Sequence, residues 1–162
     1  MNNIELVFPE IFISLSIMFL LILGVFKKES SRIIQNLCLV VLLTTAVITF
    51  NETISVGKIT LFNGSILIDY LSSFMKIMTL LAAFVVLLIS SNYLKTFRIF
   101  KIEYPILILS SVLGMMIMIS SNDLIIFYMG LELQSLALYV LATFNRDQLK
   151  SSEAGLKYFV LS

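Results

Sequence analysis

Long apolar stretches constrain this sequence more than any other feature. A transmembrane helix needs about 20 mostly apolar residues to cross roughly 30 Å of hydrocarbon. Hydrophobic residues make up 59% of the 162 residues, more than a water-soluble core of this size could bury. The sequence therefore predicts an all-α, polytopic transmembrane helix bundle that forms one membrane domain, residues 1–162. Its five full spans are expected at residues 6–26, 33–50, 71–89, 104–119 and 124–144.

A sixth apolar segment is shorter than the others. As a helix, residues 152–162 rise only about 16 Å, which is about half of the hydrocarbon thickness. A chain end at that depth is tolerated only inside protein or beside a hydrated cavity. We therefore expect a partial sixth span that a second polypeptide completes, as a split gene would produce, or else a truncated sequence.

The positions of the basic residues predict the orientation in the membrane. Basic residues gather in the loops after the first, third and fifth spans: Lys27, Lys28, Arg32, Lys95, Arg98, Lys101, Arg146 and Lys150. The loops on the other side of the membrane carry Lys58 as their clear cation. By the positive-inside rule, the N-terminus then faces the outer, positive side.

The connection between the second and third spans, residues 51–69, is the longest non-helical stretch expected. Within it, the apolar runs 59–62 and 66–68 flank Asn63-Gly64. An Asn-Gly pair between apolar runs is typical of a β-hairpin. We therefore expect a short hairpin on the outer side.

Two charged residues of the predicted spans, Glu132 and Lys157, are the leading candidates for a functional role. Glu132 lies about nine residues into the fifth span, where an unpaired carboxylate costs at least a few kcal/mol. It is either a proton-exchanging group or a structural carboxyl that hydrogen-bonds through Gln134 or Ser135. Lys157 follows in the sixth segment, displaced along the axis by about 10 Å, which favours a hydrated relay over a direct salt bridge. Alternatively, Lys157 snorkels to the inner headgroups.

Other charged residues are weaker candidates. Lys76 and Asp69 are secondary candidates for proton transfer, but Lys76 lies near enough to the outer interface to snorkel, which is the favoured interpretation. Glu10 and Glu153 fall in first helical turns, where carboxylates stabilise the helix dipole, and no chemistry is assigned to them.

Several kinds of site are missing from the sequence. It contains no Gly-rich phosphate loop, dinucleotide fingerprint or nucleophile elbow, and it has no His. Its one cysteine, Cys38, cannot form a disulfide or ligate a cluster within this chain. We therefore expect redox chemistry to lie in other chains.

The sequence resembles a known family through motifs spread along its length. These are Phe8-Pro9-Glu10-Ile11, Phe62-Asn63-Gly64 with Asp69, Phe74-Met75-Lys76, the stretch from Gly114-Met115-Met116 through Ser121-Asn122-Asp123-Leu124 to Gly130-Leu131-Glu132-Leu133-Gln134-Ser135-Leu136-Ala137-Leu138-Tyr139, and Ser152-Glu153-Ala154-Gly155-Leu156-Lys157-Tyr158-Phe159. With these motifs the chain resembles the N-terminal third of subunit 2 of respiratory complex I, called subunit N in bacteria.

The resemblance implies an antiporter-like, proton-translocating membrane-arm subunit of NADH:ubiquinone oxidoreductase. It implies that Glu132 and Lys157 take part in proton movement, and that further essential lysines lie beyond this sequence. It also implies that this chain binds no cofactor itself, with NADH, FMN, iron–sulfur clusters and ubiquinone held by partner subunits. The expected partners are other membrane-arm subunits, a second chain carrying the rest of the subunit, and lipid, with no nucleic acid.

Two alternatives and two locations remain open. The chain could instead belong to a multisubunit cation/proton antiporter, or act as a non-pumping assembly scaffold. The absence of His and Trp beside abundant Ile, Phe, Asn and Lys suggests an AT-rich organellar gene. The mitochondrial inner membrane is therefore the expected location, with a bacterial plasma membrane as the alternative.

Overall fold

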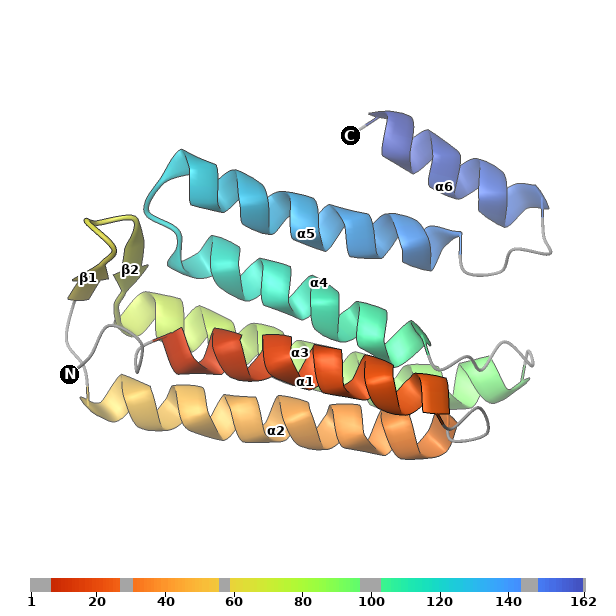
Figure 1. Cartoon of the computed structure of the whole chain (residues 1–162), viewed down its shortest axis with the longest axis horizontal. Helices are drawn as coiled ribbons and strands as arrows, with labels where there is room; N and C mark the ends of the chain where they lie inside the picture. Colours follow the sequence, from red (N-terminus) through yellow and green to blue (C-terminus); the bar gives the residue numbers. More distant parts are fainter. Residues whose placement is uncertain (1–6, 27–30, 56–58, 97–102, 144–148, 162) are drawn as a thin grey trace.

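Six helices and one two-stranded hairpin make up the part of the chain that the structure describes (Figure 1). The computed structural model describes residues 7–26, 31–55, 59–96, 103–143 and 149–161. The elements are α1 (Phe8–Phe26), α2 (Ser31–Ser55), β1 (Ile59–Leu61), β2 (Ile66–Ile68), α3 (Tyr70–Thr96), α4 (Glu103–Ser120), α5 (Leu124–Ala142) and α6 (Leu149–Leu161).

Consecutive helices run in opposite directions (Figure 1). Helices α1, α3 and α5 begin, and α2 and α4 end, beside the two strands, and this end of the bundle is called the hairpin end. The connections after α1, α3 and α5 therefore meet at the opposite end. Most of the basic residues that predict the orientation lie outside the described residues: Lys27, Lys28, Lys58, Arg98, Lys101 and Arg146. The membrane orientation stays a prediction.

Five helices are long and apolar enough to cross a membrane within the described ranges. These are Phe8–Phe26, Arg32–Glu52, Tyr70–Ser90, Glu103–Ser120 and Leu124–Ala142, and the mean hydropathy of their most apolar windows lies between 1.7 and 2.3. The predicted bundle of five spans, the start of a sixth and a small hairpin is confirmed.

The helix bounds differ clearly from the predicted ones at three places. Helix α3 continues to Thr96, although its span was predicted to end at residue 89. Helix α2 continues to Ser55, although the non-helical connection was expected from residue 51. The residues Asn51 to Ser55, all polar except Ile54, do not break a helix, and no Gly or Pro follows before Gly57. Helix α6 begins at Leu149, three residues before the predicted start, and its 13 residues rise about 20 Å.

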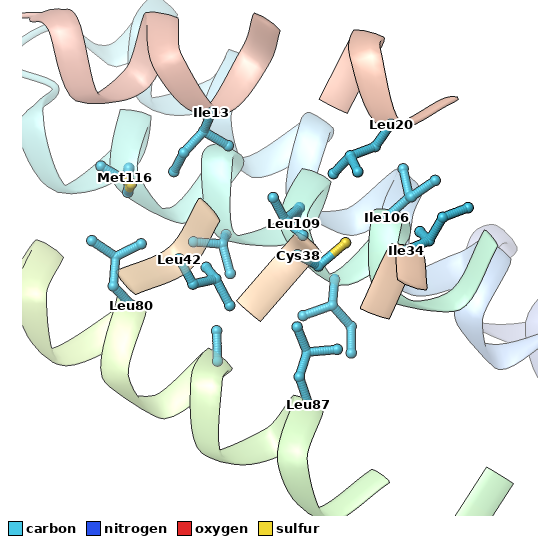
Figure 2. Packing of buried hydrophobic residues seen from close by; sticks show 13 residues of the cluster. Ile13, Leu20, Ile34, Cys38, Leu42, Leu80, Leu87, Ile106, Leu109 and Met116 are labelled. Carbon is cyan, nitrogen blue, oxygen red and sulfur yellow. The ribbon is translucent and has the colours of Figure 1, made fainter. Parts of the chain in front are cut away.

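The core lies where α1, α2, α3 and α4 meet (Figure 2). Each helix contributes apolar side chains spaced three or four residues apart, which places them on one face. Helix α4 packs against α1, α2, α3 and α5, and half of its membrane-spanning window is buried. The labelled members of this cluster are Ile13, Leu20, Ile34, Cys38, Leu42, Leu80, Leu87, Ile106, Leu109 and Met116.

The hairpin forms as predicted, but its turn is centred one residue earlier than Asn63-Gly64. The amide of Gly64 donates to the Leu61 carbonyl at 3.1 Å, so Phe62 and Asn63 are the central residues, with φ of 51° and 57°. The loop between the strands, residues 62–65, also contains Gly64 with φ of 89°, so three successive residues have left-handed backbone. Strand β1 then pairs antiparallel with β2 through Leu61 and Ile66.

Asn122, between α4 and α5, ties the hairpin to the bundle. Its Nδ2 donates to the Gly64 carbonyl at 2.6 Å, and its backbone amide donates to the Ser65 carbonyl at 2.9 Å. We expect Asn122→Ala to remove the side-chain bond and to loosen the hairpin by about 1 kcal/mol. Hydrogen exchange of the hairpin amides should accelerate about fivefold. Equal acceleration in the middle of α4 would instead indicate a global effect.

Candidate functional site

Glu132 lies in the middle of α5. It follows Leu124, the first residue of the helix, by eight positions, which places it about 12 Å from the hairpin end. Its side chain is partly exposed in this chain. Tyr128, one turn earlier on α5, lies on the same face of the helix as Glu132. Ser135 donates to the Glu132 backbone carbonyl at 3.0 Å, so it does not hold the carboxylate as the structural alternative supposes.

Helix α6 packs against the second half of α5. The Tyr139 ring meets those of Tyr158 and Phe159 edge to face, with centroids 4.7 and 5.6 Å apart. Gly155 faces Thr143 so closely that a Cβ added there would collide with the Thr143 methyl group. These contacts fix the position of α6 along the bundle axis relative to α5.

Lys157 is therefore displaced from Glu132 along the bundle. It precedes Tyr158, which contacts Tyr139, and Tyr139 is seven residues or about 10 Å beyond Glu132 along α5. Lys157 is exposed in this chain. Among the described residues, no ion pair joins Glu132 to Lys157. A direct salt bridge is absent at this site, and a relay between the two groups stays a prediction.

A small pocket lies between α5 and α6, beside the span from Glu132 to Lys157. Its volume is about 230 Å³, which is room for several water molecules at about 30 Å³ each. The amide, hydroxyl and phenol groups among its lining residues can hydrogen-bond to water. The lining residues are Leu131, Gln134, Ser135, Leu138, Tyr139 and Tyr158.

Lys76 does not snorkel, and this interpretation was wrong. Its residue is 3% exposed, and its Nζ lies 2.5 Å from Glu10 Oε1. Glu10, which was assigned to the helix dipole alone, is 7% exposed and forms a buried ion pair with it. Helices α1 and α3 bring the Glu10 carboxylate and the Lys76 ammonium into contact. Because the ammonium is paired inside the bundle, Lys76 does not need to extend to the lipid headgroups.

Asp69 caps α3 instead of joining Lys76. Its Oδ1 accepts from the Ser72 amide at 2.7 Å, and the Ser72 hydroxyl accepts from the Asp69 amide at 3.0 Å. This is the reciprocal arrangement of a helix N-cap. Within the described part of the chain, no group of three or more His, Cys, Asp or Glu residues could hold a metal ion.

Glu10 is the residue that the sequence analysis missed. A usable signal is present in retrospect, because Glu10 and Lys76 both lie within the first two turns of helices that start at the same end of the bundle. Residues at such positions have similar depth, so an acidic and a basic residue can pair there. Which neighbour each helix faces is a tertiary property, and the sequence pattern does not contain it.

Comparisons with known proteins identify relatives for the whole chain. Residues 121–162 match the family described as NADH:quinone oxidoreductase/Mrp antiporter, TM. The NADH-quinone oxidoreductase subunit N of Pelagibacter ubique is 66% identical over 162 residues, covering 100% of this chain and 34% of the relative. Subunit N of Maricaulis maris is 47% identical, covering 99% of this chain and 33% of the relative.

A solved structure has the same fold. One chain of respiratory complex I from Thermus thermophilus aligns with a TM-score of 0.76 and 23% identity, covering 94% of this chain and 32% of that chain. The chain thus spans about one third of the length of the curated relatives and of the structural neighbour that it matches.

Proposed function

We propose that this chain, which is related over its whole length to subunit N of NADH-quinone oxidoreductases, forms the N-terminal part of the corresponding subunit in a proton-translocating membrane arm. The resemblance to this family, predicted from the sequence, is confirmed by these relatives. The matched family description also covers Mrp antiporters, so it does not separate the two transport functions. The 66% identity to a subunit N favours the oxidoreductase over the cation/proton antiporter.

Glu132 and Lys157 are the groups we assign to proton movement. The observation that supports this assignment is the pocket between α5 and α6, whose largely apolar lining includes the polar side chains of Gln134 and Ser135. The pocket adjoins Glu132 through Leu131 and Ser135 and reaches the level of Lys157 through Tyr158. Water in this pocket would bridge the distance of about 10 Å that separates the two charges. A carboxylate and an ammonium joined by water can exchange a proton without a direct ion pair.

The surroundings of the chain follow from the same proposal. We place redox cofactors and quinone in partner subunits, and the remaining helices of the subunit beyond these 162 residues. A second polypeptide carrying those helices stays a prediction. The relatives reported above are bacterial, which favours a bacterial plasma membrane over the mitochondrial inner membrane, with the hairpin end on the outer side.

The test is proton pumping by the assembled oxidoreductase in sealed vesicles. We expect Glu132→Gln and Lys157→Met each to lower proton uptake per NADH oxidised by about tenfold or more. The matched controls are Glu103→Gln and Lys150→Met, both exposed in this chain, and neither should change the ratio. Normal pumping by both site variants would contradict the assignment. A Glu132 variant that fails to assemble while its residual complex pumps normally would favour the scaffold function.

A further inference from the structure

A glutamine in the middle of α5 has a side chain whose hydrogen bonds the described part of the chain does not satisfy. Gln134 follows Leu124, the first residue of the helix, by ten positions, or about 15 Å. Its side chain is partly exposed, and its amide forms no hydrogen bond to another described residue. An amide at membrane depth is strongly disfavoured unless water or another polar group reaches it.

The packing of α4 on α5 fixes where Gln134 lies. Helix α5 lies between α4 and α6 (Figure 1). A Cβ on Gly114 of α4 would lie 2.7 Å from the Gln134 backbone nitrogen and 3.1 Å from its Cα, so α4 packs directly on the Gln134 backbone. From this position Gln134 lines two cavities, the pocket between α5 and α6 and a groove between α3, α4 and α5.

The groove offers the amide little hydrogen bonding. Its volume is about 700 Å³, and its lining is mostly hydrocarbon and thioether. Its hydroxyl group, that of Thr79, already donates to the Lys76 backbone carbonyl at 2.8 Å. The other residues of this lining are Met75, Met78, Ala82, Met115, Met118, Ile119 and Phe127. The pocket between α5 and α6 is therefore the side on which the amide can hydrogen-bond.

Water in that pocket needs polar partners, because a buried water molecule typically makes about two to four hydrogen bonds and apolar cavities stay dry. Much of the lining is apolar, and the Ser135 hydroxyl already donates its proton to the Glu132 backbone carbonyl. The Gln134 amide supplies two N–H donors and a carbonyl acceptor, more donors than any other side chain of the lining.

We propose that Gln134 is a positioning residue for proton movement, whose amide holds water in the pocket between α5 and α6. This inference rests on the proposed function, in which that water joins Glu132 to Lys157. Gln134 lies about 200° around α5 from Glu132, so it acts through the water and not by bonding to the carboxylate. The amide takes up no proton itself, and its hydrogen bonds keep the water in place.

Two measurements on the assembled oxidoreductase test this role, proton pumping in sealed vesicles and hydroxyl-radical footprinting. Radicals formed from bound water modify the side chains beside it, and Tyr139 lines the pocket although it is only 8% exposed. Gln134→Met keeps the length of the side chain and removes the amide. We expect it to lower Tyr139 modification and proton uptake per NADH by about fivefold each, the factor for one lost hydrogen bond.

Two further variants separate the amide from its surroundings. Gln134→Asn retains an amide and should keep both readouts closer to wild type than Gln134→Met does. Gln35→Met is the matched control, because Gln35 is a buried glutamine of α2 whose Nε2 donates to the Leu87 carbonyl at 3.1 Å, outside the pocket lining. Assembled complex with Gln35→Met should match wild type in both readouts.

Three results overturn the proposal. Wild-type modification of Tyr139 in Gln134→Met shows that the amide does not hold the water. Reduced modification with normal pumping shows that this water does not serve proton movement. Equal losses in Gln134→Asn and Gln134→Met show that the amide is not the group responsible. Failure of the proposed function is recognised separately, since Glu132→Gln and Lys157→Met then pump normally, whereas Tyr139 modification in Gln134→Met still reports whether the amide holds water.

Discussion

Replacing Lys76 with methionine is expected to destabilise the subunit by about 3–5 kcal/mol, because removal of one partner leaves a buried charge uncompensated. The ammonium is buried against the Glu10 carboxylate. Methionine keeps most of the side-chain volume, so the loss reports on charge and not on packing. The measurement is the thermal unfolding midpoint of the purified complex, together with the fraction of subunit assembled on native gels.

A double variant separates charge from packing. Lys76→Met combined with Glu10→Gln removes both charges of the ion pair, so it should recover much of the lost stability. Lys150→Met is the matched control, because Lys150 is exposed on α6 and substitutions at such positions usually change stability by less than about 0.5 kcal/mol. If the Lys76→Met and Lys150→Met variants unfold at the same temperature, the buried ion pair contributes nothing to stability.

Hydropathy and turn chemistry were sufficient to predict the spans and the hairpin. Apolar length is set by the bilayer, and each span satisfies its own backbone hydrogen bonds, so local sequence determines these elements. The ends of α2 and α3 and the start of α6 were less well predicted, because polar residues such as Asn51 neither form nor break a helix strongly.

The buried ion pair could not be predicted in the same way. Glu10 and Lys76 are 66 residues apart, and their contact depends on how α1, α2 and α3 pack together. Both residues lie in the first two turns of their helices, and from this position alone the sequence predicts charges near the membrane interface. By contrast, Glu132 stands out from its local sequence, since a carboxylate in the middle of a span has no interface within reach.

A second feature of the packing was also overlooked, although the sequence contains a signal for it. Gly114 and Gly130 lie eight residues on either side of Asn122, which connects α4 to α5. Two antiparallel helices bring such equidistant positions to the same level. In the structure, a Cβ on Gly114 would lie 2.8 Å from the Gly130 carbonyl oxygen, and a Cβ on Gly130 would lie 2.9 Å from the Gly114 carbonyl oxygen.

Gly114→Val should therefore force α4 and α5 apart. A Cβ at this position also meets the backbone nitrogen of Gln134 at 2.7 Å, and backbone atoms cannot move away as a side chain can. We expect a loss of about 1–3 kcal/mol, with Gly114→Ala at the lower end of that range.

Substitution of Gly114 should also lower proton pumping, because Gly130, which it contacts, lies two residues from Glu132. A shift of α5 should change the position of the carboxylate relative to α6, so pumping per NADH should fall in the order wild type, Gly114→Ala, Gly114→Val. Ala82→Val is the control, since Ala82 is exposed on α3 and borders open space. Unfolding midpoints and pumping ratios that stay at wild-type values in both Gly114 variants would show that the close approach of α4 and α5 is not required.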